Sequence, residues 1–230
     1  MAVLTIYQSM KDLWFISGLG ADESVFSKLH FDGWHHHFIS WIPPLPKESL
    51  PAYARRLSAQ ITTPNPVLIG YSFGGMLAVE MAHFLPVQRV IVLASSKTSA
   101  EIPPYYRGYA RLLPLLRLLH PQWIALRLPW LIYRLFGAKD KQSKQVLRSF
   151  IKEADEDFLI WAMQAIAQWK SRGIPDGVRH IHGTADKVLP FRYVKADVAI
   201  PHGGHLMVME QPETVGRALS SLLPPSEPTE

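Results

Sequence analysis

The feature that most restricts the fold of this chain is an alternation of short apolar runs with longer segments of helical periodicity. Six runs, most of them rich in Val and Ile, are expected to be strands, at 13–17, 38–42, 67–71, 90–94, 178–182 and 194–200. The spacing of apolar residues predicts helices over 48–60, 75–84 and 212–223. Apolar strands that alternate with helices are typical of an α/β fold, a mostly parallel sheet flanked by helices.

One long stretch departs from this alternation. More than eighty residues separate the runs at 90–94 and 178–182, and they are rich in Leu, Trp, Tyr and Arg, with prolines at 103, 104, 114, 121 and 129. Structureless loops of this length are uncommon in compact domains, so an inserted helical segment is expected. The organisation we predict is a first core part at 1–96, the insertion at 97–175, a second core part at 176–225 and a frayed tail at 226–230.

The positive charge of the chain is concentrated in the insertion. The net charge is +5, yet residues 97–175 hold 13 Lys or Arg against 6 Asp or Glu, whereas the remainder holds 11 against 13. With no zinc-binding, RNA-binding or heptad pattern beside this local excess, nucleic acid is not an expected partner. No transmembrane segment is expected either, because arginines interrupt the apolar sequence of the insertion: Arg111, Arg117, Arg127 and Arg134.

Composition and the amino terminus narrow the chemistry further. The chain has no cysteine, which excludes thiol catalysis, disulfides and thiolate metal sites. The first residues lack a basic stretch followed by a long apolar run and a cleavage site, so a cytoplasmic location is expected. His35, His36 and His37 resemble a metal tract, but consecutive residues of an extended segment alternate between faces. We therefore expect them in a surface loop, with no metal site and no cofactor.

The clearest chemical motif is a serine in a glycine-rich turn. The pattern G-x-S-x-G at 70–74 directly follows an apolar run and leads into a segment of small, helix-forming residues. Such a turn lifts the serine hydroxyl above the sheet edge, and the helix amino terminus directs free N–H groups at a developing oxyanion. Ser72 is therefore the candidate nucleophile; the alternative is a strand-to-helix turn with an incidental serine.

A serine hydroxyl needs a histidine base and an orienting carboxylate within reach. Asp186 follows the run at 178–182, and His202 and His205 lie in the loop after the last run. Loops at strand ends are where a sheet enzyme assembles its site, although Asp is also common in ordinary turns. We favour Asp186 as the acid and His205, which lies past two glycines, as the base in preference to His202.

These motifs, in this order, resemble the α/β-hydrolase fold family over nearly the whole chain. The similarity covers 14–22 as the loop before the first helix, 70–75 as the nucleophile elbow, 182–190 as the acid loop and 203–212 as the histidine loop. The resemblance implies that backbone N–H groups of Leu19 and Phe73 form the oxyanion hole and that the insertion is a helical cap. Ser17 departs from the family, in which many members carry histidine before the glycine, so the side-chain support of this loop is left open.

The activity implied is that of a serine hydrolase that cleaves an ester or thioester-like bond through an acyl-enzyme, a carboxylesterase for an apolar acyl group. Ser72 also argues against the dehalogenase and epoxide-hydrolase branches, which use an aspartate nucleophile. Alternatives are a lyase or acyltransferase with the same triad, or a non-catalytic protein that binds a lipid or partner.

The insertion leaves two further questions open. Its aromatic residues either line an acyl pocket or, as we expect for most of them, pack the insertion on the core: Trp123, Trp130, Tyr133, Phe136, Trp161 and Trp169. Its arginines are either solvated, or attract an anionic or carrier-bound ester, or make transient contact with a membrane surface.

Overall fold

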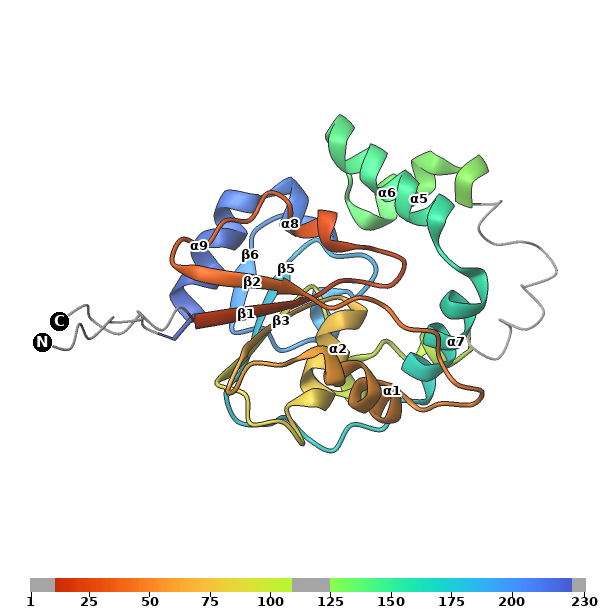
Figure 1. Cartoon of the computed structure of the whole chain (residues 1–230). Coiled ribbons are helices and arrows are strands. Elements are labelled where there is room, and N and C mark those ends of the chain that lie inside the picture. Colours follow the sequence, from red (N-terminus) through yellow and green to blue (C-terminus); the bar gives the residue numbers. More distant parts are fainter. Residues whose placement is uncertain (1–10, 109–124, 225–230) are drawn as a thin grey trace, which may run out of the picture.

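The computed structural model describes residues 11–108 and 125–224. In this part of the chain a parallel sheet has the order β2-β1-β3-β4-β5-β6 (Figure 1). The strands are β1 (Lys11–Ile16), β2 (Trp34–Phe38), β3 (Val67–Tyr71), β4 (Arg89–Leu93), β5 (Val178–Gly183) and β6 (Val198–Ile200). The predicted α/β fold class is confirmed.

Helices cover both faces of the sheet, and the core is accordingly double. Alternate residues of β1 divide between the two faces: Leu13 and Phe15 pack with α8 (Met207–Glu210) and α9 (Pro212–Leu222). Trp14 and Ile16 pack on the other face with α1 (Leu50–Leu57) and α2 (Phe73–Met81). Central strands are therefore buried on both sides, which is why β3 reads as an unbroken apolar run.

The second strand lies earlier in the sequence than predicted. The apolar run suggested 38–42, whereas β2 ends at Phe38 and carries the three histidines that we expected in a surface loop. β2 is at the edge of the described sheet and its pattern of burial is mostly exposed, so packing does not require apolar residues there. The histidines do alternate between faces: the ring of His37 stacks on Trp14, and that of His36 meets Phe15 edge-on.

The labelled helices of the insertion lie beyond the carboxyl ends of the strands, on the right of Figure 1. They are α5 (Pro129–Phe136), α6 (Lys141–Glu153) and α7 (Glu156–Gln168). The buried face of α7 joins the cluster formed by α1 and α2, and Trp169, just after it, donates an indole N–H to buried Glu80 at 2.7 Å. No helix among the described residues combines the length and apolarity that a membrane crossing requires.

Candidate active site

The turn between β3 and α2 holds Ser72 in a strained conformation. Its φ of 52° and ψ of −119° lie where residues with a Cβ are seldom found. Glycines make this turn possible, because a Cβ at Gly70 would lie 2.5 Å from the carbonyl oxygen of Gly74, and one at Gly74 would collide with the carbonyl oxygen of Ile16. Buried Ser95 donates to the Ser72 carbonyl at 2.6 Å. The elbow is thus fixed by close backbone contacts at its two glycines and by the hydrogen bond from the Ser95 side chain.

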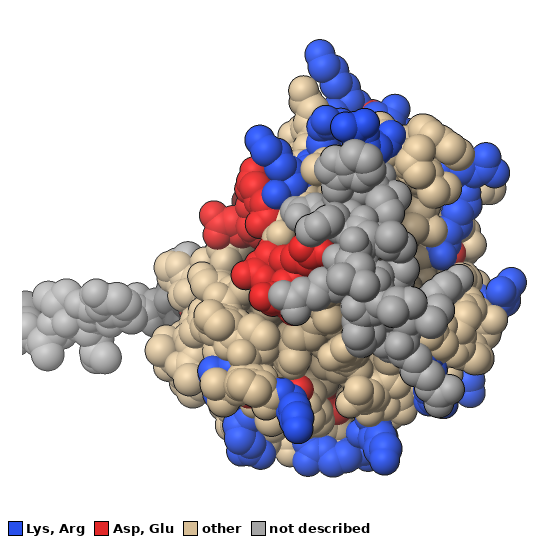
Figure 2. Space-filling view, turned by 90° about the vertical axis from the view of Figure 1, so that its right-hand side faces the viewer, with Lys and Arg blue, Asp and Glu red and all other residues tan. Residues whose placement is uncertain are grey.

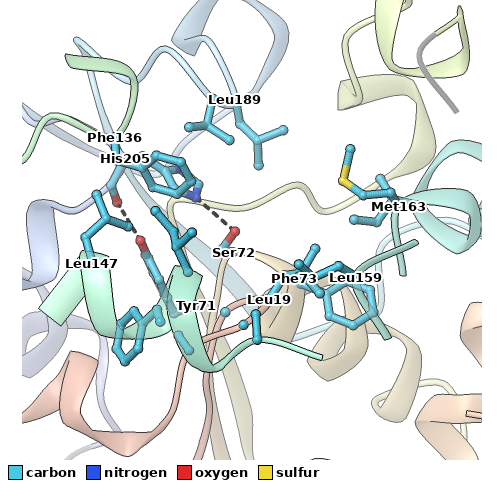
Figure 3. A pocket seen from close by; sticks show the side chains of 18 of the residues that line it. Leu19, Tyr71, Ser72, Phe73, Phe136, Leu147, Leu159, Met163, Leu189 and His205 are labelled. Carbon is cyan, nitrogen blue, oxygen red and sulfur yellow. Dashed lines mark hydrogen bonds between the residues drawn. The ribbon is translucent and has the colours of Figure 1, made fainter. Parts of the chain in front are cut away.

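Ser72, His205 and Asp186 lie in one hydrogen-bonded chain, drawn in part in Figure 3. His205 Nε2 is 2.9 Å from Ser72 Oγ, and His205 Nδ1 is 2.7 Å from Asp186 Oδ2. A carboxylate accepts, so Nδ1 donates to it and Nε2 is left to accept the serine proton. His205 and Asp186 are 1% and 4% exposed, which keeps water from competing for these bonds. This order of groups is the one that nucleophilic serine catalysis needs.

The acid is held by its own loop. Asp186 Oδ1 accepts from the backbone N–H groups of Val188 and Leu189 at 2.8 and 2.9 Å, which leaves Oδ2 for His205. His182, one residue before the end of β5, reaches within 3.4 Å of the same Oδ2. In the motif at 182–190 a role was predicted only for Asp186. The contact of His182 with this acid was not predicted.

The rival histidine lies elsewhere. His202 is exposed, and its backbone N–H donates to the hydroxyl of Thr184. The structure therefore brings His205, and not His202, to Ser72.

Two aromatic residues fix the histidine in place. The Tyr71 hydroxyl donates to the backbone carbonyl of His205 at 3.2 Å, and burial raises the pKa of Tyr71 so that it remains a donor. The ring of Phe136, at the end of α5, meets the imidazole of His205 edge-on at 5.5 Å between centroids. The N–H of Leu206 donates to the Phe136 carbonyl, which ties the histidine loop to the insertion.

Leu19 and Phe73, the predicted oxyanion residues, both line the cavity beside Ser72 (Figure 3). Phe73 is the first residue of α2, and a helix has no internal acceptor for the N–H of its first residue. The loop of Leu19 is braced by side chains: Ser17 Oγ and Trp41 Nε1 donate to the Ala21 carbonyl at 2.8 and 2.9 Å. The side chain of Ser17 thus supports this loop, a point that the sequence left open, and Trp41 is a brace that no sequence motif indicated.

A cavity of about 340 Å³ opens beside Ser72 and His205. Figure 3 shows Phe136 and Leu147 on the histidine side and Leu159 and Met163 on the opposite side. The described lining contains no Lys or Arg, and Glu156 is its carboxylate. Within the described ranges, no group of three or more His, Asp or Glu side chains is arranged to hold a metal ion. The chemistry that this arrangement can supply is attack of a serine on a substrate with an apolar part.

The aromatic residues of the insertion are mostly packing, as expected. Of those named from the sequence, Phe136 lines the cavity. Trp161 donates to the Glu48 carbonyl, Trp169 binds Glu80, and Tyr133 packs against the core. Trp130 is 63% exposed and belongs to neither group, and Trp123 lies outside the described residues. Of the arginines, Arg127 and Arg134 are exposed, and Arg111 and Arg117 lie outside the described part.

Comparison with solved structures identifies proteins of similar fold. An esterase from Thermogutta terrifontis matches with a TM-score of 0.68 and 19% identity, covering 92% of this chain and 88% of its own. An esterase from Exiguobacterium antarcticum gives 0.69 and 16%, covering 92% and 91%. A bromoperoxidase from Bacillus anthracis gives 0.65 and 15%, also covering 92% and 91%. At these identities the likeness concerns the fold.

Comparison with curated protein sequences found no match. The family model described as the alpha/beta hydrolase family, in contrast, matches residues 15–218, a range that runs from β1 through the elbow, acid and histidine loops to α9. With this match over most of its length and the parallel sheet that carries it, the chain belongs to the alpha/beta hydrolase family.

Proposed function

We propose that this protein is a serine hydrolase that cleaves the carboxylic ester or thioester bonds of apolar acyl groups through an acyl-enzyme. The observation that carries the proposal is the chain of two hydrogen bonds from Ser72 through His205 to Asp186, at the wall of an apolar cavity. Esterases among the structures of similar fold are consistent with this choice.

In the first step His205 Nε2 removes the proton of Ser72 as Oγ attacks the acyl carbonyl carbon. The positive charge that develops on the imidazole is stabilised by Asp186, which accepts from Nδ1. The same imidazole then gives its proton to the leaving alcohol or thiol, and the serine ester remains. A water molecule deprotonated by His205 completes the cycle, releasing the acid and restoring the Ser72 hydroxyl.

The negative charge of each tetrahedral intermediate falls on the former carbonyl oxygen, and the N–H groups of Leu19 and Phe73 are proposed to donate to it. Backbone donors are effective here because they are fixed before the reaction, Phe73 by α2 and Leu19 by the braced loop. Loss of one such donor typically costs on the order of a hundredfold to a thousandfold in turnover.

The insertion at 97–175 is proposed to act as the cap of this site. Helices α6 and α7 contribute much of the apolar lining, through side chains such as Leu147, Phe150 and Met163. Because burying each methylene is worth about 0.8 kcal/mol, an apolar wall of this kind selects for the length of the acyl chain. A lyase or acyltransferase reaction of the same triad would be distinguished by its products.

The proposal is tested first at the nucleophile. Labelling with a fluorophosphonate probe, followed by peptide mass mapping, should place the adduct on Ser72, and Ser72→Ala should abolish both labelling and hydrolysis of p-nitrophenyl esters. Turnover should fall by several orders of magnitude, as it does when a triad member is removed elsewhere. Ser220→Ala, at an exposed position of α9, is the matched control and should label like the native protein. A folded Ser72→Ala protein that is still labelled contradicts the proposal.

A further inference from the structure

The outer face of α5 exposes large apolar side chains. Trp130 is 63% exposed, Leu131 45% and Leu135 37%, and Leu128 just before the helix is also exposed. Large apolar residues gathered on one short helix are unusual on a soluble surface and mark a contact with another apolar phase. The opposite face of the same helix is occupied, because Ile132, Tyr133 and Phe136 pack against the core.

Exposed cations lie next to this apolar face and on the neighbouring helix α6. Arg127 and Arg134 are exposed on α5 or next to it, and the exposed side of α6 carries Lys141, Arg148 and Lys152 at spacings of seven and four residues. Blue side chains gather along the top of Figure 2, where these helices lie. Of the acidic residues nearby, Asp140 is bound by Lys28 and the N–H of Ser143. The others, Glu153, Asp155, Glu156 and Asp157, lie together where α6 ends and α7 begins, at the opposite end of α6 from Lys141.

These helices are fixed relative to the candidate active site. Their inner faces line the cavity, through Phe136 of α5 and Leu147 and Phe150 of α6. The junction between them is bound to the segment after His205, because Glu210 Oε1 accepts from the N–H groups of Lys139 and Asp140 at 2.6 and 3.2 Å. A surface that binds the outside of α5 and α6 therefore lies next to the cavity.

We propose that the exposed sides of α5 and α6, called here the docking face, bind the surface of an anionic lipid bilayer. Such a surface matches the docking face in two ways. Its negative headgroups attract the cations, and its apolar layer accepts Trp130 and the leucines. A second copy of this chain would bring like charges together, so charge disfavours self-association through the face. Binding is peripheral, with the helices lying in the headgroup region.

The docking face would deliver lipid-soluble esters to the cavity between α6 and α7. This part of the inference rests on the proposed esterase function, whereas binding to the bilayer does not. Ser72→Ala should therefore bind vesicles like the native protein. If fluorophosphonate labelling fails while vesicle binding is observed, the esterase proposal falls and the docking face stands; the reverse result has the opposite meaning.

The first experiment is vesicle co-sedimentation. One set of vesicles is phosphatidylcholine with roughly a quarter phosphatidylglycerol, and the other is phosphatidylcholine alone. The native protein should bind the first set at least about tenfold more tightly. Salt at about 0.5 M should remove most of this difference in affinity. Lys141→Glu with Arg148→Glu should remove the preference, and Leu131→Ser with Leu135→Ser should weaken binding about tenfold or more. The matched controls, Ile174→Ser and Arg217→Glu, change an exposed apolar residue and an exposed cation away from the face.

A second experiment uses the absence of cysteine from the chain. Leu131→Cys, labelled with an environment-sensitive fluorophore, should shift to shorter wavelength on the anionic vesicles, and labelled Ile174→Cys should not. Thermal unfolding of each variant verifies that it is folded. The proposal is overturned if both labels respond alike, if neither responds, or if the charge variants bind as the native protein does. Vesicle-independent association that Leu131→Ser abolishes would overturn it in favour of a contact between copies.

Discussion

At the scale of single residues, the environment behind the acid is built from two buried histidines. His182 Nε2 lies 2.8 Å from the Leu189 carbonyl, which only accepts, so this nitrogen carries the proton. His182 Nδ1 then accepts from His180 Nε2 at 2.9 Å. Both side chains are fully buried, and burial lowers the pKa of both, with the neighbouring His182 and Lys97 lowering that of His180 further and Asp186 opposing the shift of His182. The pair is thus neutral in the folded protein.

This neutrality predicts how stability depends on pH. Unfolded histidine titrates near about 6.5, so below that pH the unfolded chain takes up protons that the folded state does not. The free energy of unfolding should be unaffected by the pair above about pH 7 and should fall as pH decreases below about 6.5, by at most about 1.4 kcal/mol per pH unit for each histidine. Urea unfolding at about pH 7.5 and 5.5 measures the slope. His182→Gln should lessen it, exposed His202→Gln should not, and equal slopes in all three proteins would show the pair to be irrelevant.

The choice between His205 and His202 is a second prediction at this scale. His205 is within 2.9 Å of Ser72 Oγ, whereas His202 is exposed in the preceding turn. His205→Ala should lower kcat by on the order of 10⁴-fold or more, about as much as Ser72→Ala, because the residues act as one unit. His202→Ala should retain activity within a few-fold. Steady-state kinetics with a p-nitrophenyl ester decides the matter, and the opposite ranking would mean that the base is misassigned.

At the scale of secondary structure, the elbow and α7 have different tasks. The elbow depends on strand β3 and helix α2 meeting at a turn whose close contacts require glycine at 70 and 74, so it fixes the position of the proposed nucleophile Ser72. Helix α7 presents Leu159, Met163 and Ile166, spaced by four and three residues, on the face that lines the cavity. In the proposed function the elbow therefore sets the chemistry, and α7 sets the space available to a substrate.

A larger side chain on the cavity-facing side of α7 should shorten the acyl chains that the site accepts. With the native protein kcat/KM should rise about fourfold per methylene, corresponding to about 0.8 kcal/mol, until the cavity is full. Met163→Trp should move the maximum to shorter chains with little change for the acetate ester. A panel of p-nitrophenyl esters gives the profile, and Gln168→Trp, at the exposed end of α7, is the control. An unchanged profile would place the acyl chain elsewhere.

At the scale of the whole molecule, charge and catalysis are separated in space. Ser72 lies at the end of β3, beside an apolar cavity whose described lining has no Lys or Arg, while Arg127, Arg134 and Arg148 of the insertion are exposed. Charges at such a position act on the encounter with a ligand and not on the chemical step. We therefore expect exposed Arg134 on α5 and Arg127 just before it to act on association.

This separation predicts a difference between substrates. Raising ionic strength from about 0.05 to 0.5 M should raise the apparent KM for an anionic ester, because the Debye length shortens, and should leave a neutral ester of equal chain length almost unchanged. Arg127→Glu with Arg134→Glu should reproduce the salt effect without altering kcat for the neutral ester. If both esters respond alike to salt and to charge reversal, the cations of the insertion are merely solvated.

The sequence by itself determined the sheet architecture, the elbow and the order Ser72, Asp186, His205. These features are local: a run buried on both faces, a turn that needs glycine, and loops that follow strands. Since parallel strands end at one edge of a sheet, residues just after three strands meet there without further information. Because β3 is a run buried on both faces, its bounds at 67–71 were predicted correctly.

Only the tertiary structure decided the positions of those side chains that the local patterns leave undetermined. Edge position, and not hydrophobicity, placed β2 over the histidines, because an edge strand is not required to be apolar. Packing of α7 on α1 and α2 turned Trp161 toward the core and Met163 toward the cavity. Trp41 reaches Ala21 from twenty residues away. Such contacts depend on how helices are rotated against the sheet, which is set by packing across the whole core and not by the residues adjacent in sequence.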